Sequence, residues 1–118
     1  MTIINSDSMS GVDRPQQSVA RTAAEWQTLW QQHAPGRSLP PVDFAKNMVV
    51  AVFLGSRPSG GYEAQITGVR LEGGTLVVQW AERRPAPGQT AAQVMTSPAH
   101  IATVARHEGQ VRFEKVEQ

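Results

Sequence analysis

The chain has 118 residues, no cysteine and a formal net charge of +1. This length suits one domain with a core of its own, and the lack of thiols excludes disulfides and thiolate metal sites. The near-neutral charge argues against nucleic acid or an anionic membrane surface as the partner.

Neither a membrane span nor a secretion signal is expected from the sequence. No apolar run approaches the roughly 18–20 residues of a transmembrane helix. The N-terminal residues have no basic start followed by an apolar segment, so no signal peptide is expected in this chain. The compartment and the oligomeric state stay open at this point.

The first residues differ in composition from the rest. Residues 1–15 are mostly polar and small, and we expect them to form a flexible N-terminal arm. The remaining residues, 16–118, are expected to form a single β-rich domain, because no linker or repeat interrupts them. A short edge strand is expected first, over residues 16–21.

One helix is indicated after Thr22. Thr22 and Glu25 have the spacing of a capping box, in which a hydroxyl and a carboxylate each satisfy a free backbone N–H. Trp26 and Trp30 then lie on one helical face, and Pro35 with the following glycine ends the helix. We interpret this face as one packed on a sheet; the alternative is a tryptophan platform for a ligand.

The most hydrophobic stretch is VVAVFL at residues 49–54. A continuous apolar run of this length, rich in β-branched residues, is typical of a strand buried on both faces. The loop GSRPSGG follows directly at residues 55–61, where glycine and proline give the backbone a defined shape.

Further strands alternate apolar and polar residues, with turns between them. A Gly-Gly hairpin is expected at Gly73 and Gly74, and a second hairpin at residues 107–110. The expected strands are residues 62–71, 76–80, 101–106 and 111–116. We therefore predict a mainly β (α+β) fold: an antiparallel β-sandwich or a twisted half-barrel, with one N-terminal amphipathic helix packed on the sheet.

If successive strands run antiparallel, three Pro-containing loops share one rim of this fold: residues 55–62, 83–88 and 96–100. Shaped loops at one end of a rigid β scaffold commonly form a binding surface. The arginines among them suit carboxylates and phosphates, although solubility and local turn contacts are the favoured explanation for isolated surface arginines. The candidate binding residues are Arg57, Pro58, Ser59, Gly60, Gly61, Tyr62, Arg83, Arg84, Pro85, Ser97 and His100.

Catalytic and cofactor motifs are not evident. The histidines, His33, His100 and His107, lack metal-ligand spacing, and no cofactor is expected. A hydrolase would have to combine Ser59 with His100, with Glu63 or Asp43 as a third member, and no G-x-S-x-G motif supports it. The glycine-rich loop at residues 55–61 lacks the G-K-[ST] ending of a phosphate loop.

Several stretches resemble the C-terminal domain of the PrcB family of protease complex subunits. They are EWQTLWQQH at residues 25–33, PVDF at 41–44, VVAVFLGSRPSGGYEAQI at 49–66, RPAPG at 84–88, TSPAH at 96–100 and VRF at 111–113. The resemblance runs from about residue 17 to the end of the chain. Where the family carries an aromatic residue after T-S-P, this chain has Ala99.

The resemblance implies a bacterial, non-enzymatic accessory domain with a protein partner, because the family is named for a lipoprotein subunit that stabilises a secreted protease. It points to an extracytoplasmic compartment. A more distant similarity links Arg57–Tyr62 and Arg84-Pro85 to the loops of chagasin-like protease inhibitors, although Ala86 replaces their tryptophan. Three functions are therefore weighed: an accessory binding domain, a protease inhibitor, and a small-ligand-binding domain or hydrolase.

Overall fold

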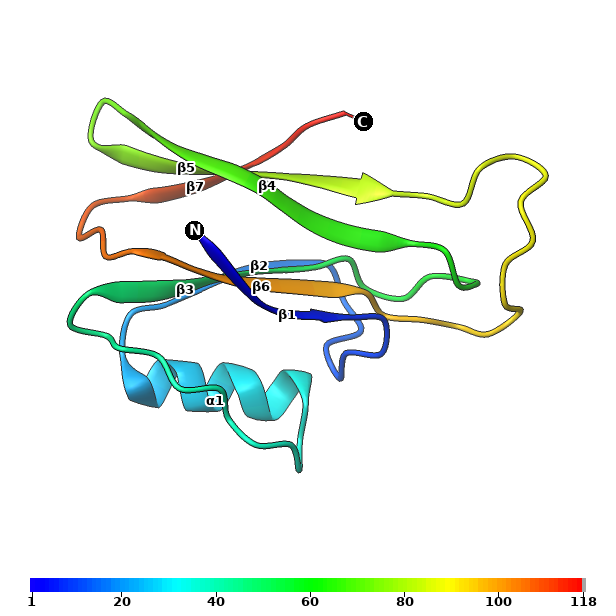
Figure 1. The fold of residues 1–118 in the computed structure, drawn as a ribbon, viewed down its shortest axis with the longest axis horizontal. Coiled ribbons are helices and arrows are strands. Elements are labelled where there is room, and N and C mark those ends of the chain that lie inside the picture. The colour runs from blue at the N-terminus through cyan, green and yellow to red at the C-terminus, as the bar shows by residue number, and fades with distance from the viewer. Residues whose placement is uncertain (118) are drawn as a thin grey trace.

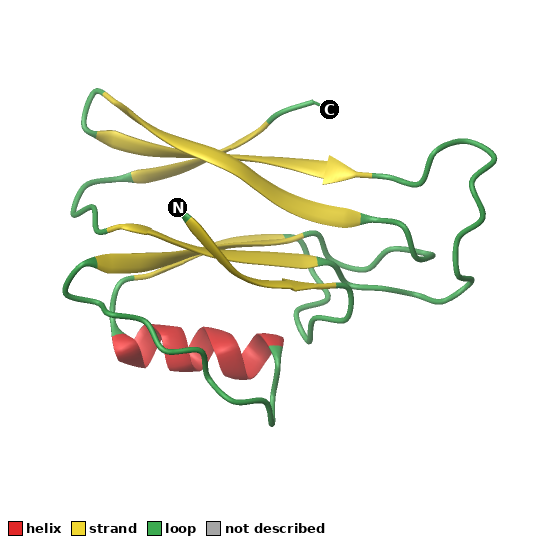
Figure 2. Ribbon diagram, in the orientation of Figure 1, coloured by secondary structure: helices red, strands yellow, loops and turns green. Residues whose placement is uncertain are grey.

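The computed structural model describes residues 1–117, and over these residues the chain forms one helix and seven strands (Figures 1 and 2). The elements are β1 (Thr2–Asp7), β2 (Gln16–Ala20), α1 (Ala23–His33), β3 (Asn47–Phe53), β4 (Glu63–Glu72), β5 (Thr75–Arg83), β6 (Ala99–Ala105) and β7 (Val111–Lys115).

The elements form three layers. The first sheet has the strand order β1-β6-β3-β2 and is antiparallel throughout, and the second has the order β4-β5-β7. Helix α1 covers one face of the first sheet, and the second sheet lies on the other side (Figure 2). This arrangement confirms the predicted mainly β fold with one packed helix, and of the two predicted forms it is the sandwich.

Strand β3 is the centre of the molecule. Residues 48–53 all have no exposed surface, which confirms a strand buried on both faces. Val49 and Phe53 face the helix layer, where they pack with Trp26, whereas Val50 and Val52 face the second sheet. Two hydrophobic cores therefore share this one strand, since side chains alternate between the two faces of a sheet.

The start of α1 follows its sequence signal closely. Thr22 is the N-cap, and its Oγ1 accepts a hydrogen bond from the Glu25 N–H at 3.1 Å. The Glu25 carboxylate accepts from the N–H of Arg21 at 2.8 Å, one residue earlier than in a standard capping box. Thr22 and Glu25 together satisfy backbone donors that would otherwise lie unpaired at the helix terminus.

The tryptophans of α1 belong to the core. Trp26 and Trp30 are 1% and 5% exposed, and their ring centroids lie 5.4 Å apart. Their indole N–H groups donate to the carbonyls of Pro40 and Arg37 at 2.9 and 3.0 Å. The segment after the helix therefore closes over the rings, and packing on the sheet, not a ligand platform, accounts for both.

Two segments differ from the sequence expectation. Thr2–Asp7 was expected to lie in a flexible arm, and it forms β1, which pairs with β6 from Thr2 opposite Thr103 to Asp7 opposite Ala99. Residues 107–110 were expected to be a hairpin, and they instead connect β6 in the first sheet to β7 in the second. Both neighbours of β6 are already present, so β7 adds to the free edge of β5 and runs parallel to it.

The outer face of the second sheet is charged. Arg70, Glu72, Arg112 and Glu114 form a closed ring of ion pairs with distances of 2.9 to 3.5 Å. The hydrogen bonds from Arg70 contribute most to lowering the pKa of Glu114 to about 2. Beneath this ring Val77 has no exposed surface, so the long arginine stems cover a sheet face that no other layer covers.

Candidate functional site

The three Pro-containing loops meet at one end of the sandwich, at the right of Figure 1. Backbone hydrogen bonds join them: Arg57 and Thr96 exchange two, at 2.8 and 2.9 Å, and the Gly60 N–H donates to the Ala92 carbonyl at 2.9 Å. We call residues 8–15, 54–62 and 84–98 the loop rim. Hydrogen bonds at these and a few further positions join all three segments, so the loops form one surface.

The N-terminal segment of the loop rim was not anticipated from the sequence. Met9 pairs with Ser97, where the Ser10 N–H donates to the Ser97 carbonyl at 2.9 Å and the Ser97 N–H donates to Ser8 at 2.8 Å. Gly11 then passes against the end of α1, where an added Cβ would lie 2.3 Å from the carbonyl of Gln32. In the sequence, Gly11 itself is the sign that this segment can pass so close to the backbone of α1, because any side chain would clash there.

Arg57 braces the loop rim from inside. Its guanidinium donates to both carboxylate oxygens of Glu82, at 3.0 and 3.2 Å, and to the carbonyls of Leu54 and Ser56, both at 3.0 Å. It also lies 5.9 Å from the centroid of the half-buried Tyr62 ring. The guanidinium of Arg57 thus donates to groups of this chain. Of the two explanations given for the loop arginines, local contacts therefore apply to Arg57, and binding of an external anion does not.

Glu82 is the acidic partner that sequence reasoning missed. Its side chain is 4% exposed and faces three cations: Arg57, Arg84 at 3.6 Å and Lys115 at 3.5 Å. The hydrogen bonds from Arg57 lower its pKa, with smaller contributions from the charges of Arg57 and Lys115. The signal was available, because Glu82 continues the inward-facing series of Leu76, Val78 and Trp80 on β5.

The other candidate residues divide between internal contacts and exposed surface. Gly61 has φ +90° and abuts Pro85, whose Cγ would lie 2.8 Å from an added Cβ, so this contact joins two loops. Arg83 lies 3.6 Å from Glu63, and both are exposed. Arg84 is the most exposed of the three predicted arginines, with 70% of its side chain accessible. Pro58 is also exposed.

Ser59 and His100 have separate partners. The Ser59 hydroxyl donates to the Gly60 carbonyl at 3.0 Å. His100 is 8% exposed in β6, and its Nδ1 accepts the Ile66 N–H at 2.7 Å, where β4 has a bulge. Burial lowers the pKa of His100. The His100 ring therefore pairs with a backbone N–H of β4 inside the molecule. The expectation that His100 lies on the loop surface was wrong.

A second buried histidine connects the helix to the loop rim. His33 is 1% exposed, and its Nδ1 and Nε2 lie 2.7 Å from Ser10 Oγ and Asn5 Oδ1. Asn5 Oδ1 accepts, so Nε2 carries the proton and Nδ1 accepts from the Ser10 hydroxyl. Burial lowers the pKa of His33, and Asp7 partly opposes this effect.

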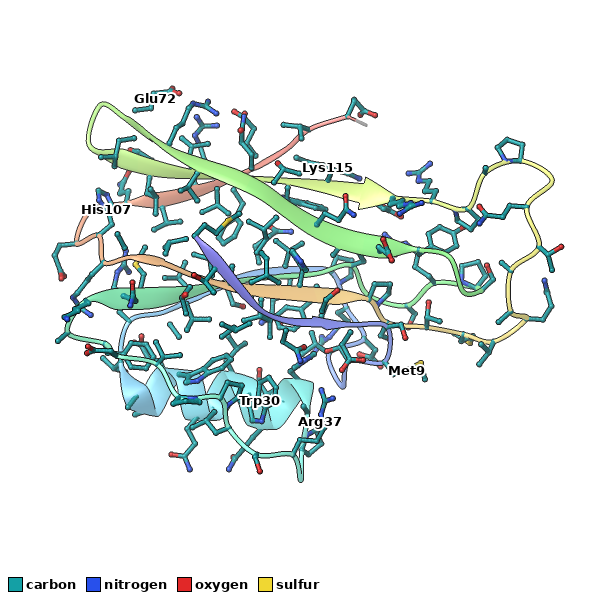
Figure 3. The ribbon with its side chains drawn as sticks, viewed as in Figure 1. Met9, Trp30, Arg37, Glu72, His107 and Lys115 are labelled. Carbon is teal, nitrogen blue, oxygen red and sulfur yellow. The ribbon has the colours of Figure 1, made fainter. Side chains whose placement is uncertain are left out.

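The loop rim also exposes apolar side chains that the sequence analysis did not select. Met9, Val94 and Met95 are 61%, 49% and 66% exposed. Met9 projects at the rim end of the molecule in Figure 3, and Val94 and Met95 directly precede the Thr96–Ser97 pairing segment. These exposed apolar side chains are available for contact with another macromolecule.

The described residues, 1–117, show neither a metal site nor a membrane-spanning helix. No group of three or more His, Cys, Asp or Glu side chains is placed to hold a metal ion. In the same part of the chain, no helix has the length and apolar character needed to cross a membrane.

The fold and its loop surface define a helix-covered β-sandwich that presents a braced loop rim at one end. Residues 48–105 match a family model described as PrcB C-terminal, so this segment of the chain is similar to a PrcB C-terminal domain. The matched segment runs from β3 to β6 and is shorter than the resemblance noted from residue 17 onward. No curated protein and no solved structure matches the chain.

Proposed function

We propose that this chain is a non-enzymatic accessory domain of a bacterial protease complex and that it binds its protein partner through the loop rim. The PrcB C-terminal domain supports association with a protease complex. The observation that carries the binding role is the exposure of Met9, Val94 and Met95 on loops that the backbone bonds of Thr96 and Ser97 hold in place.

The physical argument concerns the cost of binding. Ordering mobile loops on association opposes affinity, and loops that are already tied together avoid much of that cost. Exposed methionines then provide adaptable apolar contact area. The internal bonds of Arg57 support this role, because they shape the surface without taking part in chemistry.

The test uses two variants with matched exposure. Met95→Asp alters the loop rim, whereas Leu71→Asp alters a side chain of similar exposure, 68% against 66%, at the opposite end of β4. Each purified chain is immobilised and exposed to extract and culture supernatant of its own bacterium. We expect the native chain and Leu71→Asp to retain a protease polypeptide, and Met95→Asp to bind it about tenfold more weakly, a difference of about 1.4 kcal/mol.

The same material distinguishes an accessory domain from an inhibitor. The captured protease is assayed alone and with added native chain. We expect proteolytic activity to persist and to survive incubation longer with the chain present. Loss of activity on addition would instead assign the loop rim an inhibitory role, and equal capture by both variants would place the binding surface elsewhere.

A further inference from the structure

A groove of about 530 Å³ lies beside the loop rim, between the end of β5 and the chain that follows β7. Its walls include Arg84, Pro85 and Pro87 from the loop after β5. Lys115 at the end of β7 and Glu117 beyond it form the other wall, and Glu82 lies at the inner side. We call it the arginine groove. Figure 3 labels Lys115 at this end of β7.

The arginine groove has more positive than negative charge. Arg57, Arg84 and Lys115 all approach the single carboxylate of Glu82. Glu117 adds one further negative charge to the lining. Among residues 1–117, three cations facing two carboxylates leave one positive charge unmatched, and the neighbouring Arg83 is balanced by Glu63.

The unmatched charge resides on the exposed cations. Arg57 already donates to both oxygens of Glu82, at 3.0 and 3.2 Å. Arg84 approaches that carboxylate at 3.6 Å, too far for a good hydrogen bond, and no other partner of its guanidinium exists among residues 1–117. Lys115 reaches only 3.5 Å. Among residues 1–117 neither side chain therefore has a short hydrogen bond to an acceptor, although Lys115 also lies 5.3 Å from the centroid of the Trp80 ring.

We propose that the arginine groove binds one carboxylate group of the partner protein, with Arg84 as the planar donor and Lys115 as the second cation. The assignment rests on the proposed protein-binding function and names the chemistry that the groove recognises. A guanidinium presents paired N–H groups that match a carboxylate. One unmatched positive charge suits a monoanion better than a multiply charged phosphate or a nucleic acid.

Peptides provide the probe, because the partner segment is unidentified. The isotope-labelled full chain is titrated with acetyl-Gly-Gly-Glu-Gly-Gly-amide and with its glutamine counterpart, at constant ionic strength. We expect saturable NMR shifts at residues 82–87 and 115–117 with the acidic peptide, and none confined there with the glutamine peptide. Shifts scattered over all basic residues, or equal shifts with both peptides, would overturn the proposal.

Further titrations identify the source of the carboxylate and exclude another anion. Acetyl-Gly-Gly-Gly with a free carboxyl terminus reports whether a chain end binds better than an acidic side chain, and either preference supports the proposal. Inorganic phosphate is the competing anion. A larger and equally localised response to phosphate would overturn the assignment to a carboxylate.

Variants link the shifts to the named side chains. Arg84→Gln combined with Lys115→Gln should weaken binding of the acidic peptide about tenfold or more, because both charged donors are removed. Lys46→Gln removes an exposed charge at the start of β3, the end away from the loop rim, and should leave binding unchanged. If Lys46→Gln weakened peptide binding as much as the Arg84→Gln and Lys115→Gln pair, the binding would reflect general charge attraction, and the proposal would be contradicted.

The outcome is separable from that of the proposed function. If the acidic peptide fails to bind while Met95→Asp still loses the protease, only the assignment of the groove fails. If the peptide binds in the groove but no protease is captured by the native chain, the carboxylate site holds and the protease-complex function fails.

Discussion

Glu82 holds three cations at the inner side of the loop rim, and its replacement by glutamine measures what that charge contributes. Glu82→Gln keeps the size of the side chain but leaves Arg57, which is 24% exposed, without its counter-charge. Removing one partner of a fully buried ion pair costs about 3–5 kcal/mol. Arg57 retains some solvent and its two carbonyl acceptors, so we expect about 2–4 kcal/mol of lost stability.

The effect depends on pH in a defined direction. The native contacts lower the pKa of Glu82 below its usual 4.5, so the unfolded chain takes up the proton first as the pH falls. The stabilisation by Glu82 is therefore complete above about pH 5 and declines through pH 4.5 and below. The difference between native chain and Glu82→Gln should be largest near neutral pH and should shrink in acid.

Urea unfolding at about pH 7 and about pH 3.5 provides the measurement. Glu72→Gln is the matched control: its side chain is 57% exposed and contacts two arginines on the outer face, so we expect about 0–1 kcal/mol. Equal losses for the two variants, or a difference for Glu82→Gln that persists undiminished in acid, would refute the reasoning.

Three further predictions follow from buried contacts. Gly61→Ala should cost about 1–3 kcal/mol, because φ is +90° and the new Cβ would meet Pro85; an unchanged urea midpoint would contradict this strain. Trp26→Ala should cost about 3–5 kcal/mol, and a loss below about 1 kcal/mol would mean that α1 is not packed as described. By NMR, the rings of His33 and His100 should titrate below pH 6.5, because burial disfavours the charged imidazolium. The native chain should therefore lose stability as the pH falls below 6.5, and a midpoint above that value for either ring would count against its burial.

Features that depend on local chemistry were predictable from the sequence. Thr22 and Glu25 located the start of α1, and the spacing of the tryptophans identified its buried face. The apolar run at residues 49–54 identified β3 as doubly buried. Alternating strand directions predicted that the Pro-containing loops would meet at one end, which they do. The inferences about α1 and β3 needed only neighbouring residues, and the inference about the loops needed only the order of the strands along the chain.

Features that depend on distant partners were not predictable in the same way. Whether β7 pairs with β6 or β5 is decided by which sheet edge is free, and its own residues do not carry that information. His100 accepts the Ile66 N–H beside a bulge in β4, a contact between two sheets that forms only when they pack together. The direction of Arg57 likewise depends on Glu82, twenty-five residues later. The meeting of the Pro-containing loops was therefore predicted correctly, whereas the contacts of Arg57 and His100 within them were not.

The segment that matches the family model, residues 48–105, contains the central strands of the fold but not the elements that flank them. It begins within β3 and ends at β6, so α1 and the strands β1, β2 and β7 lie outside it. A polypeptide trimmed to residues 48–105 would lose the layer over Val49, Ala51 and Phe53 and would leave β3 with an open edge. Such a sheet is prone to pair with further copies of itself and to aggregate. An engineered fusion should therefore retain α1, β1, β2 and β7 together with the matched segment.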